Sequence, residues 1–123
     1  MARIIDSRLV LTVRNLAEST QFYVNVLGFT LHLVDGAGWC FLSRDSLTVM
    51  LGECPDERAA SELGDHSYVG YLVVEGVDEL HQQIISSGAQ VTEPEDKPWG
   101  FREFGLRTPD GHRFTFGERI KRA

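Results

Sequence analysis

The chain has 123 residues, a formal net charge of −6, and 42% hydrophobic and 24% charged residues. These values predict a globular protein with its own core and argue against a nucleic-acid partner, because phosphates repel an acidic surface. No long apolar run or export signal is visible, so we expect no membrane partner and a cytoplasmic location. In that compartment Cys40 and Cys54 are expected to be free thiols.

The first half of the chain predicts a strand, a helix and three further strands. Polar and apolar residues alternate over Arg8–Val13, and Asn15 is then placed to cap a helix that Gly28 ends. Short strands are predicted at residues 29–34, 38–42 and 47–51, with turns at Asp35-Gly36 and Arg44-Asp45-Ser46. The apolar stripe of the helix, which we expect in the core, consists of Leu16, Phe22, Tyr23, Val26 and Leu27.

A polar segment, Gly52–His66, is expected to link the two halves and to contain a helical turn near Glu57–Leu63. The pattern of strand and helix then begins again. A strand is predicted at Ser67–Val74, a helix before Gly88, and a short strand at Gln90–Glu93. The apolar stripe of this second helix consists of Val77, Leu80, Ile84 and Ile85.

The last predicted element is a β-hairpin within Lys97–Glu118. Its turn is Thr108-Pro109-Asp110-Gly111, in which proline sets φ and Gly111 can take the positive φ of a tight reversal. Apolar residues alternate with polar or small ones on both strands, so one face is expected to pack on a core. The apolar face carries Phe104, Leu106, Phe114 and Phe116, and the polar face carries Glu103, Gly105, Arg107, Arg113 and Thr115.

The two halves repeat one another in detail. Val13, Leu16, Glu18 and Gln21 have counterparts 61 residues later, at Val74, Val77, Glu79 and Gln82. A tandem duplication of one βαβββ module explains a repeat of this length better than a solenoid does. We therefore predict an α+β fold in which two curved sheets enclose a cleft. As one domain, residues 1–123 would comprise a first module near 4–52, a linker at 53–66 and a second module near 67–119.

Several segments resemble the vicinal-oxygen-chelate superfamily, which contains glyoxalases, extradiol dioxygenases, fosfomycin-resistance enzymes and bleomycin-resistance proteins. The similarity is carried by residues 13–23, by Leu27-Gly28-Phe29 and by Pro109-Asp110-Gly111. Over Pro98–Arg107 the chain is most similar to bleomycin-resistance proteins. The resemblance implies U-shaped mixed sheets around a ligand cavity, helices on the outer face, and commonly a homodimer.

Enzymes of this superfamily hold a divalent metal on His, Gln or Glu side chains that point into the cavity. The resemblance places the usual ligand positions at Arg8, Val69 and Thr115, none of which is an adequate ligand. Among the scattered histidines, His66 lies near Val69 in the sequence and is the one to check. We therefore expect no metal and no cofactor, and we lean against catalysis.

What remains is a cavity lined by aromatic and polar side chains, as a small-molecule site requires. By alternation the cavity-facing positions include Val10, Thr48, Val69, Val73 and Gly105 in addition to the expected contacts. The expected ligand contacts are Arg8, Thr12, Trp39, Met50, Tyr71, Trp99, Phe101, Glu103, Arg113 and Thr115. For Glu103 an ion pair with Arg8 or Arg113 is an equal alternative, and for Trp99 the alternative is a core plug.

Three functions follow from these observations. The first, which we expect, is metal-independent binding and sequestration of an aromatic or cationic small molecule, for instance an antibiotic, as bleomycin-resistance proteins do. The second is a metal-dependent lyase, isomerase or dioxygenase with an atypical ligand set. The third is acid–base catalysis by Glu103, which requires burial to raise the pKa of that carboxyl group.

Overall fold

The structure, a computed structural model, describes residues 2–34 and 37–121, without the side chains of residues 33–34 and 64–66. The chain divides into two compact units, Met1–Ala59 and Ala60–Ala123, which are described separately. Within the described residues, no helix is both long enough and apolar enough to cross a membrane.

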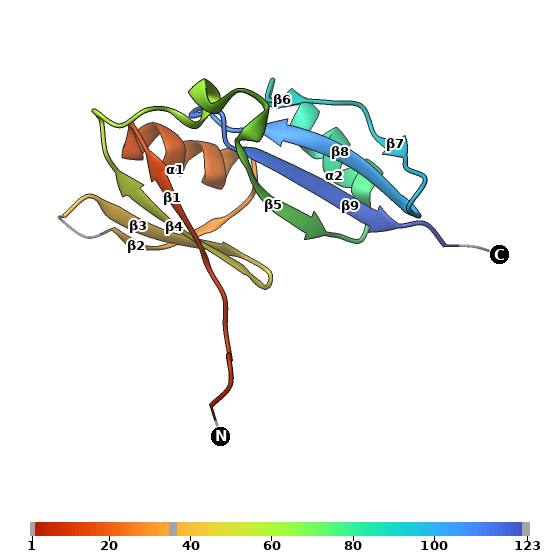
Figure 1. Cartoon of the computed structure of the whole chain (residues 1–123), viewed down its shortest axis with the longest axis horizontal. Helices are drawn as coiled ribbons and strands as arrows, with labels where there is room; N and C mark the ends of the chain where they lie inside the picture. The colour runs from red at the N-terminus through yellow and green to blue at the C-terminus, as the bar shows by residue number, and fades with distance from the viewer. Residues whose placement is uncertain (1, 35–36, 122–123) are drawn as a thin grey trace. The chain divides into compact units, whose positions relative to one another are not determined.

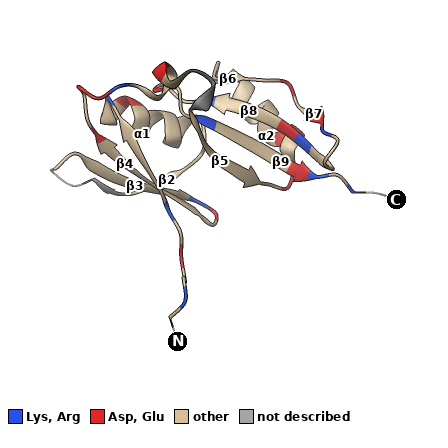
Figure 2. Cartoon of the chain, viewed as in Figure 1, with Lys and Arg blue, Asp and Glu red and all other residues tan. Residues whose placement is uncertain are grey.

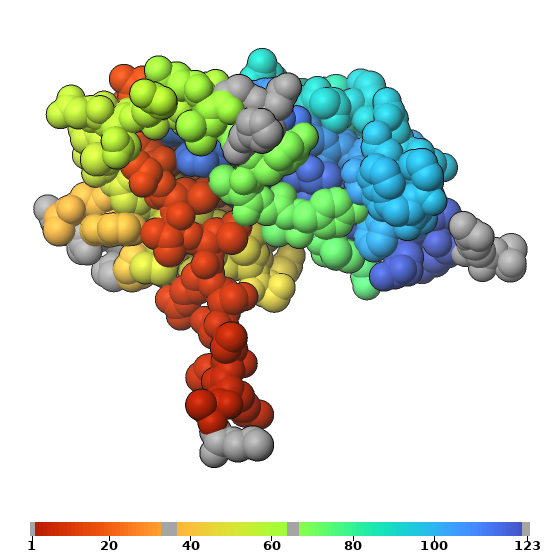
Figure 3. All heavy atoms as spheres, in the orientation of Figure 1, coloured from red at the N-terminus to blue at the C-terminus, as the bar shows by residue number. Residues whose placement is uncertain are grey.

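The first unit is one helix on a mixed four-stranded sheet (Figure 1). Its elements are β1 (Leu9–Val13), α1 (Leu16–Asn25), β2 (Thr30–Val34), β3 (Trp39–Arg44) and β4 (Leu47–Glu53). The strand order is β1-β4-β3-β2, and β1 runs parallel to β4 while the other pairs are antiparallel. The segment before β1 is extended and stands apart from the body of this unit (Figure 3).

Two side chains fix the start of α1. Asn15 accepts a hydrogen bond from the Glu18 amide at 3.0 Å, as the sequence predicts, and Glu53 at the end of β4 accepts one from the Leu16 amide at 2.8 Å. The core between helix and sheet is apolar because the inward residues of α1, β3 and β4 are buried. It includes Tyr23, Leu27, Phe29, Leu42, Val49 and Leu51.

The second unit has the same plan, again with its first strand parallel to its last. Its elements are η1 (Ala60–His66), β5 (Tyr68–Val73), α2 (Val77–Ile85), β6 (Gln90–Val91), β7 (Glu95–Asp96), β8 (Phe101–Arg107) and β9 (Arg113–Arg119). The strand order is β5-β9-β8-β6, and β7 also pairs with β8. Glu118, near the end of β9, accepts hydrogen bonds from the amides of Gly76 and Val77 and so caps α2.

The β8–β9 hairpin forms as predicted. Gly111 has φ +87°, and its amide donates to the Thr108 carbonyl at 2.8 Å. The turn is anchored within its unit because the Ser61 amide of η1 donates to the Asp110 carbonyl at 2.9 Å. The predicted apolar face is buried, and the rings of Phe104 and Phe116 stack at 5.1 Å.

The α+β class and the two mixed sheets are confirmed, whereas several details of the prediction are wrong. β1 begins at Leu9 rather than Arg8, β6 ends at Val91 rather than Glu93, and β7 was not predicted. Ile85 is 42% exposed, because the fourth buried position of α2 is His81, whose ring meets Phe104 edge to face.

The turn at residues 44–46 forms, with Asp45 at φ +51°. The turn predicted at Asp35-Gly36 lies outside the described residues. The helical turn predicted near Glu57–Leu63 lies further along the chain, at Ala60–His66. Cys40 and Cys54 are not joined in a disulfide, as expected.

Candidate functional site

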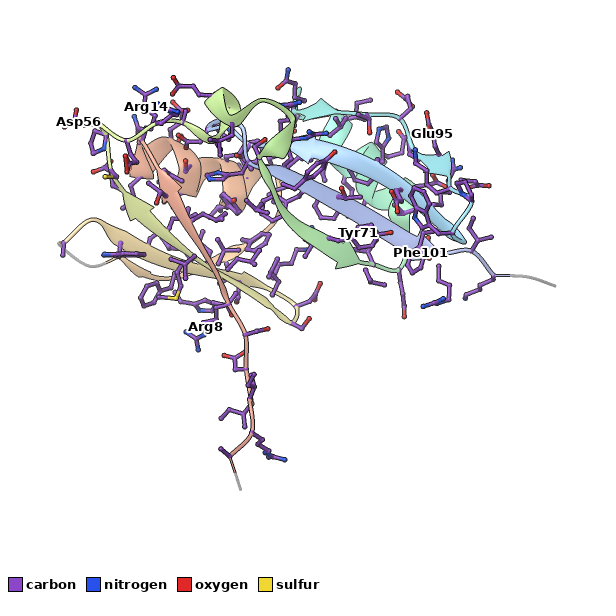
Figure 4. The ribbon with its side chains drawn as sticks, in the orientation of Figure 1. Arg8, Arg14, Asp56, Tyr71, Glu95 and Phe101 are labelled. Atoms are coloured by element: carbon purple, nitrogen blue, oxygen red, sulfur yellow. The ribbon has the colours of Figure 1, made fainter. Side chains whose placement is uncertain are left out.

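Each sheet has one face covered by its helix and an opposite face, which we call the open face. In the second unit, strand alternation turns Phe104, Leu106, Phe114 and Phe116 toward the helix side, where they are buried. The neighbouring residues therefore lie on the open face. Most of the sequence-predicted contacts of this unit belong to that face, and Figure 4 labels two of them, Tyr71 and Phe101.

Four of these residues form one group, which we call the Glu103 cluster: Tyr71, Trp99, Phe101 and Glu103. The Tyr71 hydroxyl and the Trp99 indole N–H both donate to Oε2 of Glu103, at 2.5 and 2.7 Å. The rings of Tyr71 and Phe101 meet edge to face at 5.9 Å. Glu103 is only 9% exposed, whereas Trp99 is 62% and Tyr71 45% exposed. A sheltered carboxylate is thus surrounded by accessible aromatic rings.

The loop before β8 brings Trp99 to Glu103. The Gly100 amide donates to the Lys97 carbonyl at 3.0 Å, and the Lys97 amide donates to the Phe101 carbonyl at 2.7 Å. Gly100 adopts φ +88°, which favours glycine. This tight turn directs the indole along the open face toward Glu103, so the hydrogen bond depends on the loop conformation.

The cluster also depends on a glycine of β9. Gly117 lies opposite Glu103 in the strand register, and a Cβ there would collide with the Tyr71 hydroxyl and ring. The absence of a side chain at Gly117 therefore lets the Tyr71 ring lie across β9 and reach Glu103.

The Tyr71 hydroxyl holds its proton unusually strongly. Burial, followed by the hydrogen bond to the Glu103 carboxylate and its charge, raises the pKa of Tyr71 to about 12. Tyr71 therefore stays a hydrogen-bond donor at neutral pH. Both donors of the cluster use the same oxygen of Glu103, so Oε1 is left without a hydrogen bond among the described residues. That oxygen can accept a hydrogen bond from a ligand.

Two hollows adjoin the cluster on the open face. One, of about 470 Å³, includes Tyr71, Trp99, Glu103 and Thr115 in its lining. The other, of about 480 Å³, follows β8 and also has Glu103 in its wall. We call it the β8 groove. Arg113 lies in its wall, with its guanidinium 4.0 Å from the centre of the Tyr68 ring.

The four predicted contacts of the first unit lie on or beside the open face of its sheet. Thr12 and Trp39 flank Gly52 in the register, and the Trp39 ring covers that glycine. Met50 lies on the same face, two residues before Gly52 on β4. Arg8 precedes β1 and forms an exposed ion pair with Asp6 at 3.0 Å (Figure 4).

The residues at the usual metal positions of the superfamily do not fit a divalent ion. Val69 has no donor atom, Thr115 offers a neutral hydroxyl, and Arg8 is cationic and paired with Asp6. In the part of the chain that the structure describes, no three His, Cys, Asp or Glu residues come together as a metal site. The side chain of His66 lies outside the described residues.

Sequence reasoning missed several residues of the second unit that line the β8 groove. Arg107, Thr92 and Lys97 line the β8 groove but were not among the predicted contacts. Strand alternation does place Arg107 on the face that carries Glu103. Thr92 and Lys97 had no comparable signal, because the strand that orders their segment, β7, has only two residues.

Comparisons with known proteins agree with this architecture. The profile of the Glyoxalase/Bleomycin resistance protein/Dioxygenase superfamily matches residues 7–116. A bleomycin resistance protein of Geobacillus stearothermophilus is 32% identical over 90% of this chain and 94% of its own length, and one of Staphylococcus aureus gives the same values.

Solved structures with the same fold include a bleomycin-binding protein in complex with bleomycin. It is 23% identical, with a TM-score of 0.74 over 97% of this chain and all of its own. An integron cassette protein from the metagenome of the Halifax Harbour sewage outfall is 26% identical, with a TM-score of 0.74 over 93% of this chain and 99% of its own.

Proposed function

Because this chain belongs to the Glyoxalase/Bleomycin resistance protein/Dioxygenase superfamily, we propose that it binds and sequesters an aromatic or cationic small molecule, as bleomycin resistance proteins do. Arg8, Thr12, Trp39, Met50, Tyr71, Trp99, Phe101, Glu103, Arg113 and Thr115 are the proposed contacts. Binding requires no metal in this proposal, since the residues at the usual ligand positions do not suit one.

The observation that carries this proposal is the Glu103 cluster. Aromatic rings provide a large contact area for a flat ligand, and here two of them are substantially exposed. Glu103 contributes a negative charge close to those rings and keeps one carboxylate oxygen available. The combination favours a flat ligand that carries an amine, guanidine or amidine group, because the aromatic faces and the carboxylate both attract cations.

The hydrogen bonds of the cluster also suit binding. Tyr71 and Trp99 both donate to Oε2 of Glu103. They hold the carboxylate in one orientation, which lowers the entropic cost of contacting a ligand.

We further propose that the two units act as one domain, and that the protein works as a homodimer in the cytoplasm. Exposed apolar side chains on both open faces support a second copy as partner, since Val10 is 59% and Val73 68% exposed. The free thiols of Cys40 and Cys54 suit a reducing compartment. Light scattering coupled to size-exclusion chromatography tests the dimer, and a monomeric mass at all concentrations would contradict it.

Calorimetry and tryptophan fluorescence with bleomycin and a panel of aromatic cations test the binding function. We expect at least one compound to bind stoichiometrically and to change the emission of Trp99. Trp39→Phe, which leaves Trp99 as the sole tryptophan, is the matched variant that assigns the signal. Absence of binding across the panel would contradict the proposal.

A further inference from the structure

The β8 groove differs from the Glu103 cluster in its charge. Its wall contains three basic residues, Lys97, Arg107 and Arg113, and three acidic ones, Glu93, Glu95 and Glu103. The groove therefore has equal numbers of basic and acidic residues, although the net charge of the chain is −6. Blue and red segments follow one another along β7, β8 and β9 in Figure 2. Glu103 and Arg107 are also separated, because Glu103 lies near one end of β8 and Arg107 is its last residue.

Arg107 and Arg113 lie directly opposite each other in the register of β8 and β9. Like charges at paired positions of a sheet repel and destabilise it. Arg113 lies over the Tyr68 ring at 4.0 Å. The half-buried Arg107 side chain, in contrast, has no hydrogen bond or ion pair with any described residue. Two arginines thus occupy paired positions on the open face, and no carboxylate among the described residues neutralises Arg107.

The groove floor beside these arginines offers further hydrogen-bond donors. Thr92 Oγ1 accepts a hydrogen bond from the Gly105 amide at 2.8 Å, so its hydroxyl proton can be donated elsewhere. Thr115 lies opposite Gly105, which has no side chain to cover the floor. Gln90 on β6 lies opposite Arg107, and its side-chain amide forms no hydrogen bond with any described residue. An oxyanion is the group that such an excess of donors accommodates.

The acidic end of the groove, at Glu103, lies four residues before Arg107 on β8. At a strand rise of about 3.4 Å per residue, the Cα atoms of Glu103 and Arg107 are about 14 Å apart. The other two acids, Glu93 and Glu95, are exposed, and Glu95 forms an ion pair with Lys97 at 3.0 Å, so Glu103 is the sheltered carboxylate beside the aromatic rings. The side chains of Glu103 and Arg107 are long enough to shorten this separation, so a ligand of two fused rings can contact both ends.

We propose that the Arg107 end of the β8 groove binds an oxyanion of the ligand, a carboxylate, sulfate or phosphate group. The ligand class is then an amphoteric aromatic molecule, with its cationic group at Glu103 and its anionic group between Arg107 and Arg113. Guanidinium groups match such oxyanions in geometry as well as in charge. This inference rests on the proposed function, because it places the cationic end of the ligand at Glu103, beside Tyr71 and Trp99.

Three probes with one aromatic frame test the inference: an amidinonaphthoate with its two charged groups at opposite ends, the methyl ester of that compound, and naphthamidine. Calorimetry with the full chain should show the acid binding about tenfold more tightly than its ester, the difference made by one charge-assisted contact. Arg107→Gln should remove that preference and leave the affinity for the ester unchanged. Equal affinities of acid and ester for the wild-type protein would overturn the inference.

Arg58→Gln is the matched control, since it removes the same charge from an exposed residue of the first unit that does not line the groove. It should preserve the preference for the acid. An equal loss of preference in Arg58→Gln and Arg107→Gln would mean a non-specific effect of net charge, and that result too would overturn the inference.

Titration with inorganic sulfate, followed by NMR of the arginine Nε–Hε groups, separates the two proposals. We expect sulfate to shift the signals of Arg107 and Arg113, and Arg107→Gln to abolish the response of Arg113. If these shifts occur but naphthamidine does not bind, the proposed function fails and the anion site stands. If naphthamidine binds and sulfate shifts neither signal, the function stands and the anion site is overturned.

Discussion

The indole N–H of Trp99 donates a hydrogen bond to Oε2 of Glu103 at 2.7 Å, from a loop to the strand that follows it. Glu103 is buried, whereas the Trp99 ring is mostly exposed. This bond therefore couples an accessible aromatic surface to a sheltered negative charge. Tyr71 donates to the same oxygen from a different strand, so three separate segments determine the geometry of the cluster.

Tyr71 should titrate abnormally. Its pKa is raised from the ordinary value of 10 to about 12, first by burial and then by Glu103. A raised pKa in the folded protein means that protonated Tyr71 stabilises the fold fully below pH 10, and that this contribution is lost as the pH rises toward 12. The ultraviolet absorbance of tyrosinate during a pH titration measures this.

Two variants show which groups cause the raised pKa of Tyr71. Tyr71→Phe should remove the highest transition from that titration. Glu103→Gln should lower the pKa of Tyr71 without restoring the ordinary value, because the charge is lost but burial remains. An unchanged highest transition in both variants would show that Tyr71 and Glu103 are not in contact.

Gly111→Ala should destabilise the protein more than Gly88→Ala. Both glycines have a positive φ, near +87° and +81°, so both substitutions strain the backbone. At Gly111 a Cβ would also lie 2.6 Å from the Ser61 backbone nitrogen, whereas at Gly88 it would meet nothing within 4 Å. We expect a loss of about 1 kcal/mol for Gly88→Ala and about 3 kcal/mol for Gly111→Ala in chemical denaturation. Equal losses would mean that the turn does not pack on η1.

Gly117→Ala should disrupt the Glu103 cluster and leave the sheet folded. The new Cβ would collide with the Tyr71 side chain, which has to rotate away from Glu103. The pKa of Tyr71 should then fall toward its ordinary value, and aromatic cations should bind more weakly. Gly105→Ala is the control, because its Cβ has no neighbour closer than 3.6 Å, so it should leave the Tyr71 titration unchanged. A Tyr71 pKa that stays raised in Gly117→Ala would contradict the geometry of the cluster.

Glu118 should support the fold in its ionised form. The amides of Gly76 and Val77 lower the pKa of this carboxyl group by donating hydrogen bonds to it. Its contribution is therefore present above the usual glutamate pKa and is lost as the pH falls through the lowered value.

In Glu118→Gln we expect lower stability at neutral pH and a weaker dependence of stability on pH in acid. Circular dichroism during acid unfolding measures both quantities. Glu79→Gln removes the same charge from the first turn of α2 without removing these hydrogen bonds. If the two variants behave alike, the effect comes from charge alone and not from capping.

The sequence was sufficient for the plan of each unit because the signals are local. Alternation along the hairpin, the Asn15 cap and the positive φ of Gly111 each follow from a few neighbouring residues. The capping of α1 by Glu53 and of α2 by Glu118 was not predictable in this way, because each contact joins residues about 40 positions apart.

For the site, the sequence predicted which face of the sheet carries it but not the contacts between its side chains. Alternation placed Tyr71, Phe101 and Glu103 on one side of a sheet, and the structure adds that Trp99 and Tyr71 donate to a single oxygen. The ion-pair alternative for Glu103 was open because side-chain conformations do not follow from strand alternation. In the structure Arg8 pairs with Asp6, and Arg113 lies over Tyr68.

The most direct test of the account is the affinity of an aromatic amidine for the wild-type protein and for Glu103→Gln, measured by calorimetry. The substitution keeps the size of the side chain and the partners of Oε2 but removes the negative charge. We predict binding by the wild-type protein and a loss of about tenfold or more in the variant, while a neutral aromatic of the same shape loses little. Equal affinities of the two proteins for the amidine would contradict the claim that Glu103 recognises the cationic end of the ligand.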